Sequence, residues 1–452
     1  MAVPVSVAPG CAVDGPERGV SGWLVGFDDM FARVAGRFGR VEPRRAARDL
    51  LWGLLSVVER KNSWTLAEQA GHERPDAMQR LLRTACWDAG EVRDDLRAYV
   101  VEHLGHPDGV LIPDETGDLK KGSDSVGVQR QYTGTAGRIE NAQVAVYLTY
   151  ASPRGRALID RRLYLPRCWT EDRTRCQRAG VPDEVIFATK PELAAEMVVD
   201  ALDAGVIAPW VAADEVYGAN PGFRAALESR GVGYVLAVAC DQRVRTDAWT
   251  ERADSLAARL PKRSWQRYSA GAGSKGPRLY DWAWIALSSD AGEHRSLLVR
   301  RGSDGELAYY LCWASGPVTL ATLVRVAGTR WAVEESFQAG KTHVGLDEHQ
   351  VRRWTSWHRF TTLAMLALAY LCVCTAQAAP PPDSRPGPPR HTNEHSELID
   401  LTTGEIRHLL SALVLQPTHP PTFVWLWSHW RRLHQARARR SHYKRRLAIE
   451  YD

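Results

Sequence analysis

The sequence lacks the features that mark secreted, zinc-finger and membrane-spanning proteins. Its eight cysteines include no C-x-x-C pair, so neither a zinc site nor a disulfide framework is predicted. The first residues have neither a charged start nor a sustained apolar run, which argues against a secretory signal. The longest uncharged apolar segment, which begins at Phe360, is short for a membrane span. We therefore expect reduced thiols, a buried core helix, no membrane partner and a cytoplasmic location.

Most of the chain carries almost no net charge, and the basic excess is concentrated at its end. The formal net charge is +5 for all 452 residues, yet residues 431–452 alone hold eight Lys or Arg against two acids. The rest of the chain is therefore close to neutral. A run such as "WRRLHQARARRSHYKRR" has the composition of an arm that binds nucleic-acid phosphates. A solvated terminal helix or a disordered end has the same composition.

Composition and hydrophobic period divide the chain into seven segments, and no internal repeat is present. Proline recurs six times between positions 380 and 389, which is typical of an extended linker. The predicted segments are an irregular lead-in (1–40), a helical domain (41–108), the first part of an α/β domain (109–240), a β-rich insertion (241–315), the second part of the α/β domain (316–378), a Pro-rich linker (379–400) and a C-terminal helix with the basic tail (401–452). The last helix is expected to begin with a capping box at Thr402 and Glu405.

The helical domain is predicted from apolar residues at helical spacing. The stretch "SWTLAEQAG" offers a Ser or Thr cap and a closing Gly, and "PDAMQRLLRTACW" begins with a helix-compatible Pro. Short helices around a Gly turn are typical of a helix-turn-helix that would read a DNA groove with Gln79, Arg80 and Arg83. They are equally typical of a helical bundle that contacts no DNA.

After residue 105 the period changes from helical to alternating. "GVLIPDE", "NAQVAVYLTYA" and "ALIDRRLYLP" indicate three successive antiparallel strands. They are followed by a helix that ends at Gly205, the strand "WVAAD", a second helix and the strand "YVLAVAC". This order predicts an α/β fold with a mixed sheet and flanking helices.

Acidic residues follow two of these strands in similar surroundings. "LIPDETG" contains Asp114, and "WVAADEVYG" repeats the pattern around Asp214. If the two strands lie side by side, both carboxylates share one rim of the sheet. Further on, a predicted helix presents Arg330, Glu334 and Lys341 within roughly 40° of one another. Glu335 points away from that face.

Three carboxylates gathered at one rim would repel each other unless a divalent cation lay between them. Mg²⁺ needs only a few carboxylates together with waters and substrate phosphates, so a phosphodiester is the natural substrate. In a two-metal site the ions activate the attacking oxygen and stabilise the leaving one. Arg330 and Lys341 would hold nearby phosphates. The alternative is that all three acids serve as caps, turns and surface ion pairs.

The chain resembles the DDE transposases of bacterial insertion sequences, in the insertion sequence 701 group of the insertion sequence 4 superfamily. The motifs that carry the resemblance are "ERKNSWTLAEQAG", "MQRLLRTACWD", "DETGDLKKGSDSVGVQRQYTGTAGRIENAQVAVYLTYA", "ADEVYG" and "TRWAVEESFQAGKTHVGLDEHQVRRW". The resemblance implies an RNase H-like core interrupted by a β-rich insertion. The Y-x2-R-x3-E-x6-K signature of the superfamily matches at Arg330, Glu334 and Lys341, but Ala327 stands at its Tyr position. Tyr132 is one candidate for supplying the missing group.

The resemblance also implies an activity and its partners. Asp114, Asp214 and Glu334 would be the catalytic residues and would hold two Mg²⁺ ions, for which Mn²⁺ can substitute. The substrates would be the inverted-repeat ends of a transposon and its target DNA, cut and rejoined by a DNA-bound homodimer in a bacterial cytoplasm. Two alternatives remain at this point: a catalytically inactive DNA-binding protein derived from such an enzyme, and a two-carboxylate glycosidase.

Several other residues have both a functional and a structural interpretation. Four basic residues in the Gly-rich connection after Asp114 could clamp DNA backbone or lie in a solvated loop; they are Lys120, Lys121, Arg130 and Arg138. Four tryptophans of the insertion could stack on a base or fill the core; they are Trp265, Trp282, Trp284 and Trp313. Three histidines lack metal-ligand spacing and are expected to be structural; they are His343, His349 and His358.

Overall fold

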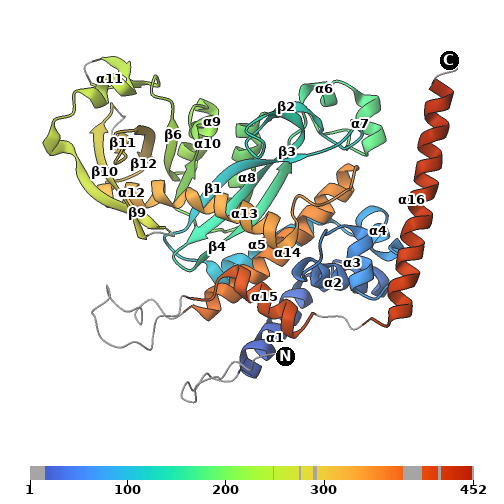
Figure 1. The fold of residues 1–452 in the computed structure, drawn as a ribbon. Helices are drawn as coiled ribbons and strands as arrows, with labels where there is room; N and C mark the ends of the chain where they lie inside the picture. The colour runs from blue at the N-terminus through green and yellow to red at the C-terminus, as the bar shows by residue number, and fades with distance from the viewer. Residues whose placement is uncertain are drawn as a thin grey trace.

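A mixed sheet with helices on both faces forms the centre of the molecule, with a helical region packed beneath it and a long helix at its side (Figure 1). The computed structural model describes residues 16–247, 249–273, 276–288, 293–379, 400–415 and 419–449. Apart from residues 379 and 400, the predicted Pro-rich linker lies outside the described residues.

The N-terminal region is helical from residue 16 onward. Its helices are α1 (Pro16–Ala35), α2 (Val41–Leu55), α3 (Ser63–Gln69), α4 (Asp76–Arg83) and α5 (Ala89–Leu104). The prediction of an irregular lead-in over 1–40 is therefore wrong for 16–35. Phe27, Met30, Phe31 and Val34 recur at helical spacing and are buried, so α1 is held by its apolar face rather than by its Gly-rich start.

The two short helices α3 and α4 flank a tight turn. Gly71 occupies the left-handed region with φ 77°, which explains why a Gly closes α3. The cap of α3 differs from the expectation. The side chain of Asn62, not Ser63 or Thr65, accepts the N–H groups of Trp64 and Thr65, and Thr65 bonds back to the Asn62 N–H. Asn is a strong N-cap because its side-chain oxygen satisfies these orphan donors.

The main sheet has ten strands within the described residues, in the order β2-β3-β1-β5-β6-β12-β11-β10-β9, with β4 paired to β3. The strands are β1 (Val110–Leu119), β2 (Gln129–Thr133), β3 (Arg138–Ser152), β4 (Gly155–Leu163), β5 (Trp210–Ala213), β6 (Gly233–Val238), β9 (Gln266–Gly273), β10 (Gly276–Ala286), β11 (His294–Arg301) and β12 (Leu307–Ala314). A separate pair joins β7 (Arg243–Arg245) to β8 (Thr250–Arg252).

Strand directions confirm the predicted fold class. The strands β1, β3 and β4 pair antiparallel, whereas β1, β5 and β6 are parallel neighbours. Segment 241–315 is rich in strands, and four of them extend the same sheet, because β12 pairs antiparallel with β6. The insertion also contacts the segment that follows it, because Arg278 of β10 donates to the Gly328 carbonyl, 3.1 Å away. The structure is thus an α/β fold with a mixed sheet that runs without a break into the insertion.

Helices cover both faces of the sheet. On one side lie α8 (Lys190–Asp203), α9 (Glu215–Gly218) and α10 (Pro221–Ser229), and on the other α12 (Leu320–Thr329), α13 (Trp331–Val344) and α14 (Trp354–Ala378). Side chains alternate along a strand. Accordingly, Lys190 of α8 reaches Glu115 of β1, while Arg330 and Lys341 reach Asp114 and Thr116. Short helices complete the domain: α6 (Arg167–Thr170), α7 (Arg173–Ala179), α11 (Ala253–Ala258) and the 3-10 turn Lys262–Ser264.

The apolar segment beginning at Phe360 belongs to α14 and is a core helix, as expected. Within the described ranges, α14 is the one helix whose length and composition would let it cross a membrane, and 78% of its most apolar window is buried inside the protein. Cys372 and Cys374 lie in this helix as free thiols.

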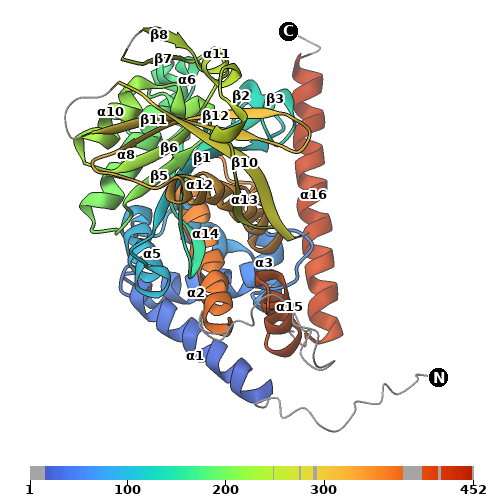
Figure 2. The ribbon, with the colours of Figure 1, turned by 90° about the vertical axis from the view of Figure 1, so that its left-hand side faces the viewer.

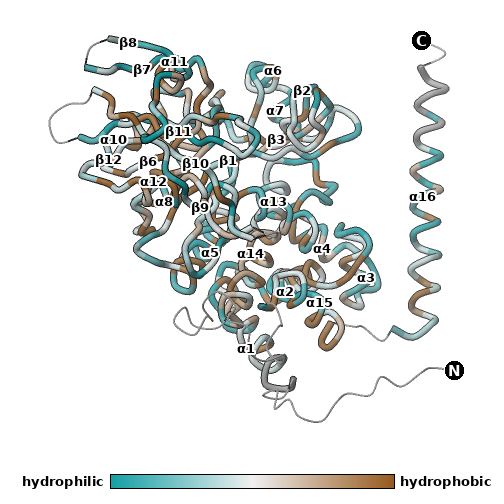
Figure 3. Tube along the Cα trace, turned by 60° about the vertical axis from the view of Figure 1, so that its left-hand side comes forward, coloured by the Kyte–Doolittle hydropathy of each residue, from teal (hydrophilic) through white to brown (hydrophobic). Residues whose placement is uncertain are grey.

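Two helices follow the Pro-rich segment. The first, α15 (Thr403–Leu413), begins after Thr402, whose hydroxyl accepts the Glu405 N–H, which is one of the two bonds of the predicted capping box. The second, α16 (Pro421–Ile449), contains most of the basic tail. Its first turns pack on α3, with Trp427 buried and the Trp430 and Trp64 rings 4.9 Å apart. Beyond them α16 runs as a long helix along one side of the body (Figures 1 and 2), and hydrophilic residues dominate that part (Figure 3).

Candidate active site

Asp114 and Asp214 lie on adjacent parallel strands. Val110 is opposite Trp210 and Leu111 opposite Val211, and continuing this register brings Asp114 level with Asp214. The two surroundings differ more than the sequence suggests. Strand β1 does not end at the acids but continues to Leu119, paired with β3 throughout. Asp214 does follow the end of its strand, where its carboxylate caps α9 by accepting the Val216 N–H at 2.9 Å.

The glycine in each repeated motif is required by close packing. A Cβ atom on Gly117 would lie 2.2 Å from the Thr133 hydroxyl, and one on Gly218 would lie 2.0 Å from the Ala237 carbonyl oxygen. Neither distance is sterically possible for a side chain. The absence of a side chain at Gly117 therefore allows Thr133 of β2 to lie close to β1. The absence of one at Gly218 allows α9, which follows Asp214, to pack against β6.

Arg330 connects the first carboxylate to the third. Its guanidinium donates to Asp114 Oδ2 at 3.3 Å and to Glu334 Oε1 at 2.6 Å. The helix predicted through this region is divided here into α12 and α13, with Arg330 between them in right-handed helical conformation (φ −52°, ψ −34°). Arg330 and Glu334 thus remain on one face. The fork of hydrogen bonds thus joins Asp114 and Glu334, which are far apart in sequence, while Asp214 lies on the adjacent strand.

Lys341 of α13 contacts the face of β1 that carries Asp114, at Thr116, two residues further along the strand. Its ammonium donates to the Thr116 hydroxyl at 2.7 Å and to the Thr135 hydroxyl at 3.1 Å. It therefore ties the β2–β3 hairpin to α13. Glu335, as expected, points elsewhere and pairs with Arg156 at 2.9 Å.

Both Asp carboxylates have pKa values above the ordinary range, and burial is the first cause in each case. Burial, together with the nearby Asp214 carboxylate, raises the pKa of Asp114 to about 7, although Arg330 opposes the shift. The pKa of Asp214 is also raised, first by burial and then by the Glu115 carboxylate. A buried like-charge pair of this kind is relieved by a cation.

Glu115 is a part of the site that the sequence did not single out. It points to the face opposite Asp114, where it accepts from Lys190 Nζ at 2.5 Å and from the Tyr217 hydroxyl at 2.6 Å. Tyr217 follows Asp214 by three residues, in "ADEVYG". The only hint in the sequence is that an acid adjoins each Asp.

The residues present suit a hard divalent cation. Asp114 and Asp214 supply carboxylate oxygens, the ligands that Mg²⁺ prefers, and a bound cation would offset the burial that raises both of their pKa values. Glu334 is the nearest further carboxylate on the same face, but it is engaged by Arg330. Accordingly, no cluster of three His, Cys, Asp or Glu side chains is preformed for a metal in the part of the chain that the structure describes.

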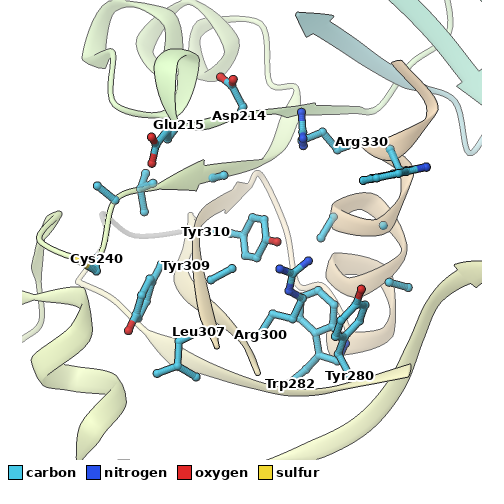
Figure 4. Close-up of a pocket in the computed structure, with 18 of the residues that line it drawn as sticks. Asp214, Glu215, Cys240, Tyr280, Trp282, Arg300, Leu307, Tyr309, Tyr310 and Arg330 are labelled. Atoms are coloured by element: carbon cyan, nitrogen blue, oxygen red, sulfur yellow. The ribbon is translucent and has the colours of Figure 1, made fainter. Parts of the chain in front are cut away.

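A cavity of about 570 Å³ opens beside Asp214 and Arg330, between α12 and the strands of the insertion. Figure 4 shows Asp214 and Arg330 at one end and Tyr280, Trp282 and Arg300 at the other. Trp282 is fully buried, and its indole N–H has no partner within the described structure. Ala327, at the Tyr position of the signature, also lines this cavity.

The remaining tryptophans of the insertion take different roles. Trp313 is in the core, 6.2 Å from the Tyr234 ring. Trp265 lies under the Arg301 guanidinium at 4.1 Å. Trp284 is 43% exposed on β10.

The four basic residues after Asp114 do not form one surface. Lys120 is largely buried, and its ammonium lies 3.2 Å from the His349 carbonyl oxygen, so it braces the chain internally. Lys121 and Arg130 are exposed. Arg138 is also exposed and pairs with Glu140 at 2.9 Å. Tyr132 is 63% exposed on β2, opposite Ile139.

The histidines have structural surroundings. His349 is buried and bonds Asp118 at 3.1 Å, and His358 Nδ1 lies 3.0 Å from the Trp354 carbonyl oxygen. Burial lowers the pKa of His343, with Arg407 and Lys61 adding to the shift. These surroundings agree with the structural interpretation.

The fold and the acidic pair agree with the resemblance to DDE proteins that the sequence motifs carry. The family model described as "DDE superfamily endonuclease" matches residues 33–275, more than half of the chain, so the chain belongs to this family. The model described as "Transposase DDE domain" matches residues 192–372.

A relative points to insertion sequences in particular. The chain is 29% identical over 204 residues to the "Probable transposase for insertion sequence element IS701" of Microchaete diplosiphon. The match covers 44% of this chain and 50% of that protein, so the chain spans half the length of this relative. The family resemblance read from the sequence motifs is confirmed.

Proposed function

We propose that this protein is the transposase of an insertion sequence, which binds the ends of its element and, with Mg²⁺, hydrolyses and rejoins phosphodiester bonds. The observation that carries the proposal is the joining of Asp114, Arg330 and Glu334 beside Asp214, at the rim of two parallel strands. Two further findings support the proposal: the related protein is named as a probable transposase, and two DDE family models match the chain.

Asp114, Asp214 and Glu334 would hold the metal, and Mn²⁺ can replace Mg²⁺ because both accept oxygen ligands. Two bound ions would activate the attacking oxygen and stabilise the leaving oxygen of a phosphodiester. Glu334 can contribute once its bond to Arg330 opens.

Arg330 and Lys341 would hold the DNA. Arg330 offers a planar fork that fits a phosphate as well as a carboxylate, and Lys341 offers a point charge held by two threonines. DNA phosphates would therefore compete with Asp114 and Glu334 for Arg330. The substrate itself would free the carboxylates for their ligand role.

One site would serve both reactions. In the first, water attacks a phosphate at the element's end, and in the second, the freed 3′-hydroxyl attacks target DNA. In both reactions the phosphate lies between an attacking oxygen and a leaving oxygen, so the same side chains can serve each of them. Because two ends must be joined to one target, the acting form would be a homodimer on DNA.

The decisive test is cleavage of duplexes that carry the element's inverted repeats, with and without Mg²⁺. Asp114→Asn, Asp214→Asn and Glu334→Gln should each abolish cleavage and leave binding to the same duplex nearly unchanged. Glu335→Gln is the matched control, since it loses only an exposed ion pair worth about 0–1 kcal/mol and should cleave normally.

Normal strand transfer by any one of the variants at Asp114, Asp214 or Glu334 would show that this residue is not part of the site. A protein that shifts end DNA in a gel yet never nicks it with Mg²⁺ or Mn²⁺ would be the inactive alternative.

A further inference from the structure

We propose that two arginine-lined cavities beside the active site form one groove that binds the backbone of the DNA duplex flanking the scissile phosphate. We call it the arginine groove, and define it by Arg83, Arg175, Arg178, Arg352 and Arg353. The inference rests on the proposed function, because it assigns the surface on which that function's DNA would lie.

The two cavities meet at Arg352 and Arg353, which line both. The larger, of about 390 Å³, lies between the α3–α4 pair and the segment that leads into α14, and Gln79 and Arg83 of α4 line it. The smaller, of about 240 Å³, lies between that segment and α7, with Arg175 and Arg178 in its wall. The groove therefore runs from the helical region to α7, near the β2 edge of the main sheet.

Its charge is strongly one-sided. Five arginines line the two cavities, whereas Asp124 is the one acid among the described lining residues. Asp124 is itself exposed and sits 3.7 Å from Arg352. Such a concentration of guanidinium groups favours binding of a polyanion. Each group can form two hydrogen bonds with a phosphate and displace a counterion from it.

Part of the groove is already rigid. The Arg175 guanidinium lies over the Trp169 ring at 3.8 Å and donates to the Ser123 carbonyl at 3.0 Å. Arg83, Arg178, Arg352 and Arg353 are exposed. One packed cation beside four exposed ones is suited to a ligand whose charges repeat along a line, such as a nucleic-acid backbone.

The groove is connected to the catalytic strand. Val126 donates its N–H to the Arg352 carbonyl at 3.0 Å, and His349, in the same segment, bonds Asp118 of β1 at 3.1 Å. Asp118 is four residues beyond Asp114 on the same face of β1, or about 13 Å along a strand. At ~3.4 Å per nucleotide along one strand, that offset corresponds to about four base pairs. A duplex cut at Asp114 could thus lay its next phosphates in the groove.

Neighbouring elements favour a duplex over a small anion. Gln79 and Arg83 are exposed on one helix face at the rim, where a groove of DNA would present base edges. Trp64 lines the same cavity and packs on Trp430, so the basic helix α16 rises from this rim. The surface is longer and more dispersed than one phosphate requires.

The test compares two double variants that remove equal charge. Arg352→Gln with Arg353→Gln empties the centre of the groove while leaving its backbone contacts. Arg243→Gln with Arg245→Gln is the control, because both side chains are exposed on β7, which lies far from α3 and α4 (Figure 3). Thermal unfolding of both should match that of the unaltered protein, since exposed side chains are replaced.

Binding to a 30-base-pair duplex and to a single strand of equal length is then measured from low to high salt. The groove variant should bind the duplex at least ten-fold more weakly, and its slope of log affinity against log salt should flatten by about two, one for each lost phosphate contact. The control should retain the original slope. An unchanged slope in the groove variant, or an equal loss in the control, would overturn the inference. So would a loss confined to the single strand.

Cleavage separates this inference from the proposed function. If the unaltered protein cuts inverted-repeat DNA while the groove variant binds DNA normally, the groove inference is wrong and the proposed function is unaffected. If the groove variant loses its salt slope while the unaltered protein never cuts with Mg²⁺, the groove stands and the enzymatic proposal fails.

Discussion

At the scale of single residues, the least expected feature is the buried ammonium of Lys61. Its side chain is almost fully buried, and its Nζ donates to the Leu54 and His343 carbonyls, at the ends of α2 and α13. Its backbone N–H donates to Glu348. Lysines are rarely buried unless paired. Lys61 thus joins the helical region to the helix that carries Glu334.

Lys61 makes stability depend on pH in a predictable direction. Burial, and then the Arg407 charge, lower its pKa from 10.5 to about 7, against the opposing Glu348. Between these values the unfolded chain holds more protons than the folded one, so folding stability should rise with pH from about 7 to about 10.5. Lys61→Met lacks this group. Relative to that variant, the unaltered protein should gain on the order of a few kcal/mol across the window.

Denaturant unfolding of both proteins at several pH values between 7 and 10 measures this difference. Other titrating groups are common to the two chains and cancel. A difference that stays constant with pH would show that Lys61 keeps an ordinary pKa.

Residues with a local pattern were predictable from the sequence, and those defined by tertiary partners were not. Asp114 and Asp214 stand out because each follows an apolar strand, and Arg330, Glu334 and Lys341 because of helical spacing. The one local hint of Glu115 is that it adjoins Asp114, because its hydrogen-bond partners are 75 and 102 positions away. For the same reason Lys120 looked like a DNA clamp, since its contacts to the segment before α14 cannot be seen in sequence.

At the scale of elements, α9 depends on the absence of a side chain at Gly218. Gly218→Ala would force a Cβ against the Ala237 carbonyl and push α9, with its cap Asp214, off β6. The expected loss of stability is about 1–3 kcal/mol, typical of overpacking. Denaturant unfolding gives the value.

Gly36→Ala is the matched control, because an added Cβ there would meet nothing within 4 Å. It should change the free energy of unfolding by less than about 0.5 kcal/mol. Equal effects of the two substitutions would contradict the packing role of Gly218.

Element types were predicted better than element ends. The antiparallel strands, the later β-α-β order and the core helix were all evident from hydrophobic period. The end of β1 was not, because Asp114 and Glu115 look like a turn signal until their pairing with Tyr147 and Val146 of β3 is known. Helix α1 was overlooked because Gly and Pro dominate its beginning, while the apolar residues that hold it come later.

At the scale of the whole molecule, α16 is the element with the least contact to the rest. Ending the chain after His434 keeps the contacts of Trp427, Trp430 and Arg431 with the helical region. It removes six Lys or Arg residues. If each meets a phosphate, the salt slope of DNA binding should flatten by up to about five.

Titration of DNA with the shortened and full-length chains at several salt concentrations measures this change. Cleavage at low salt should persist, since the acids are untouched. If the slope of log affinity against log salt is unchanged, the basic part of α16 does not contact DNA phosphates.

The insertion was expected as an appendage between two halves of a domain, whereas its strand β12 completes the hydrogen bonding of β6. Excising residues 241–315 would therefore not yield a smaller, simpler nuclease. It would leave β6 as a bare edge whose unpaired backbone groups invite self-association. Any shorter ancestor of this protein must have protected that edge in another way.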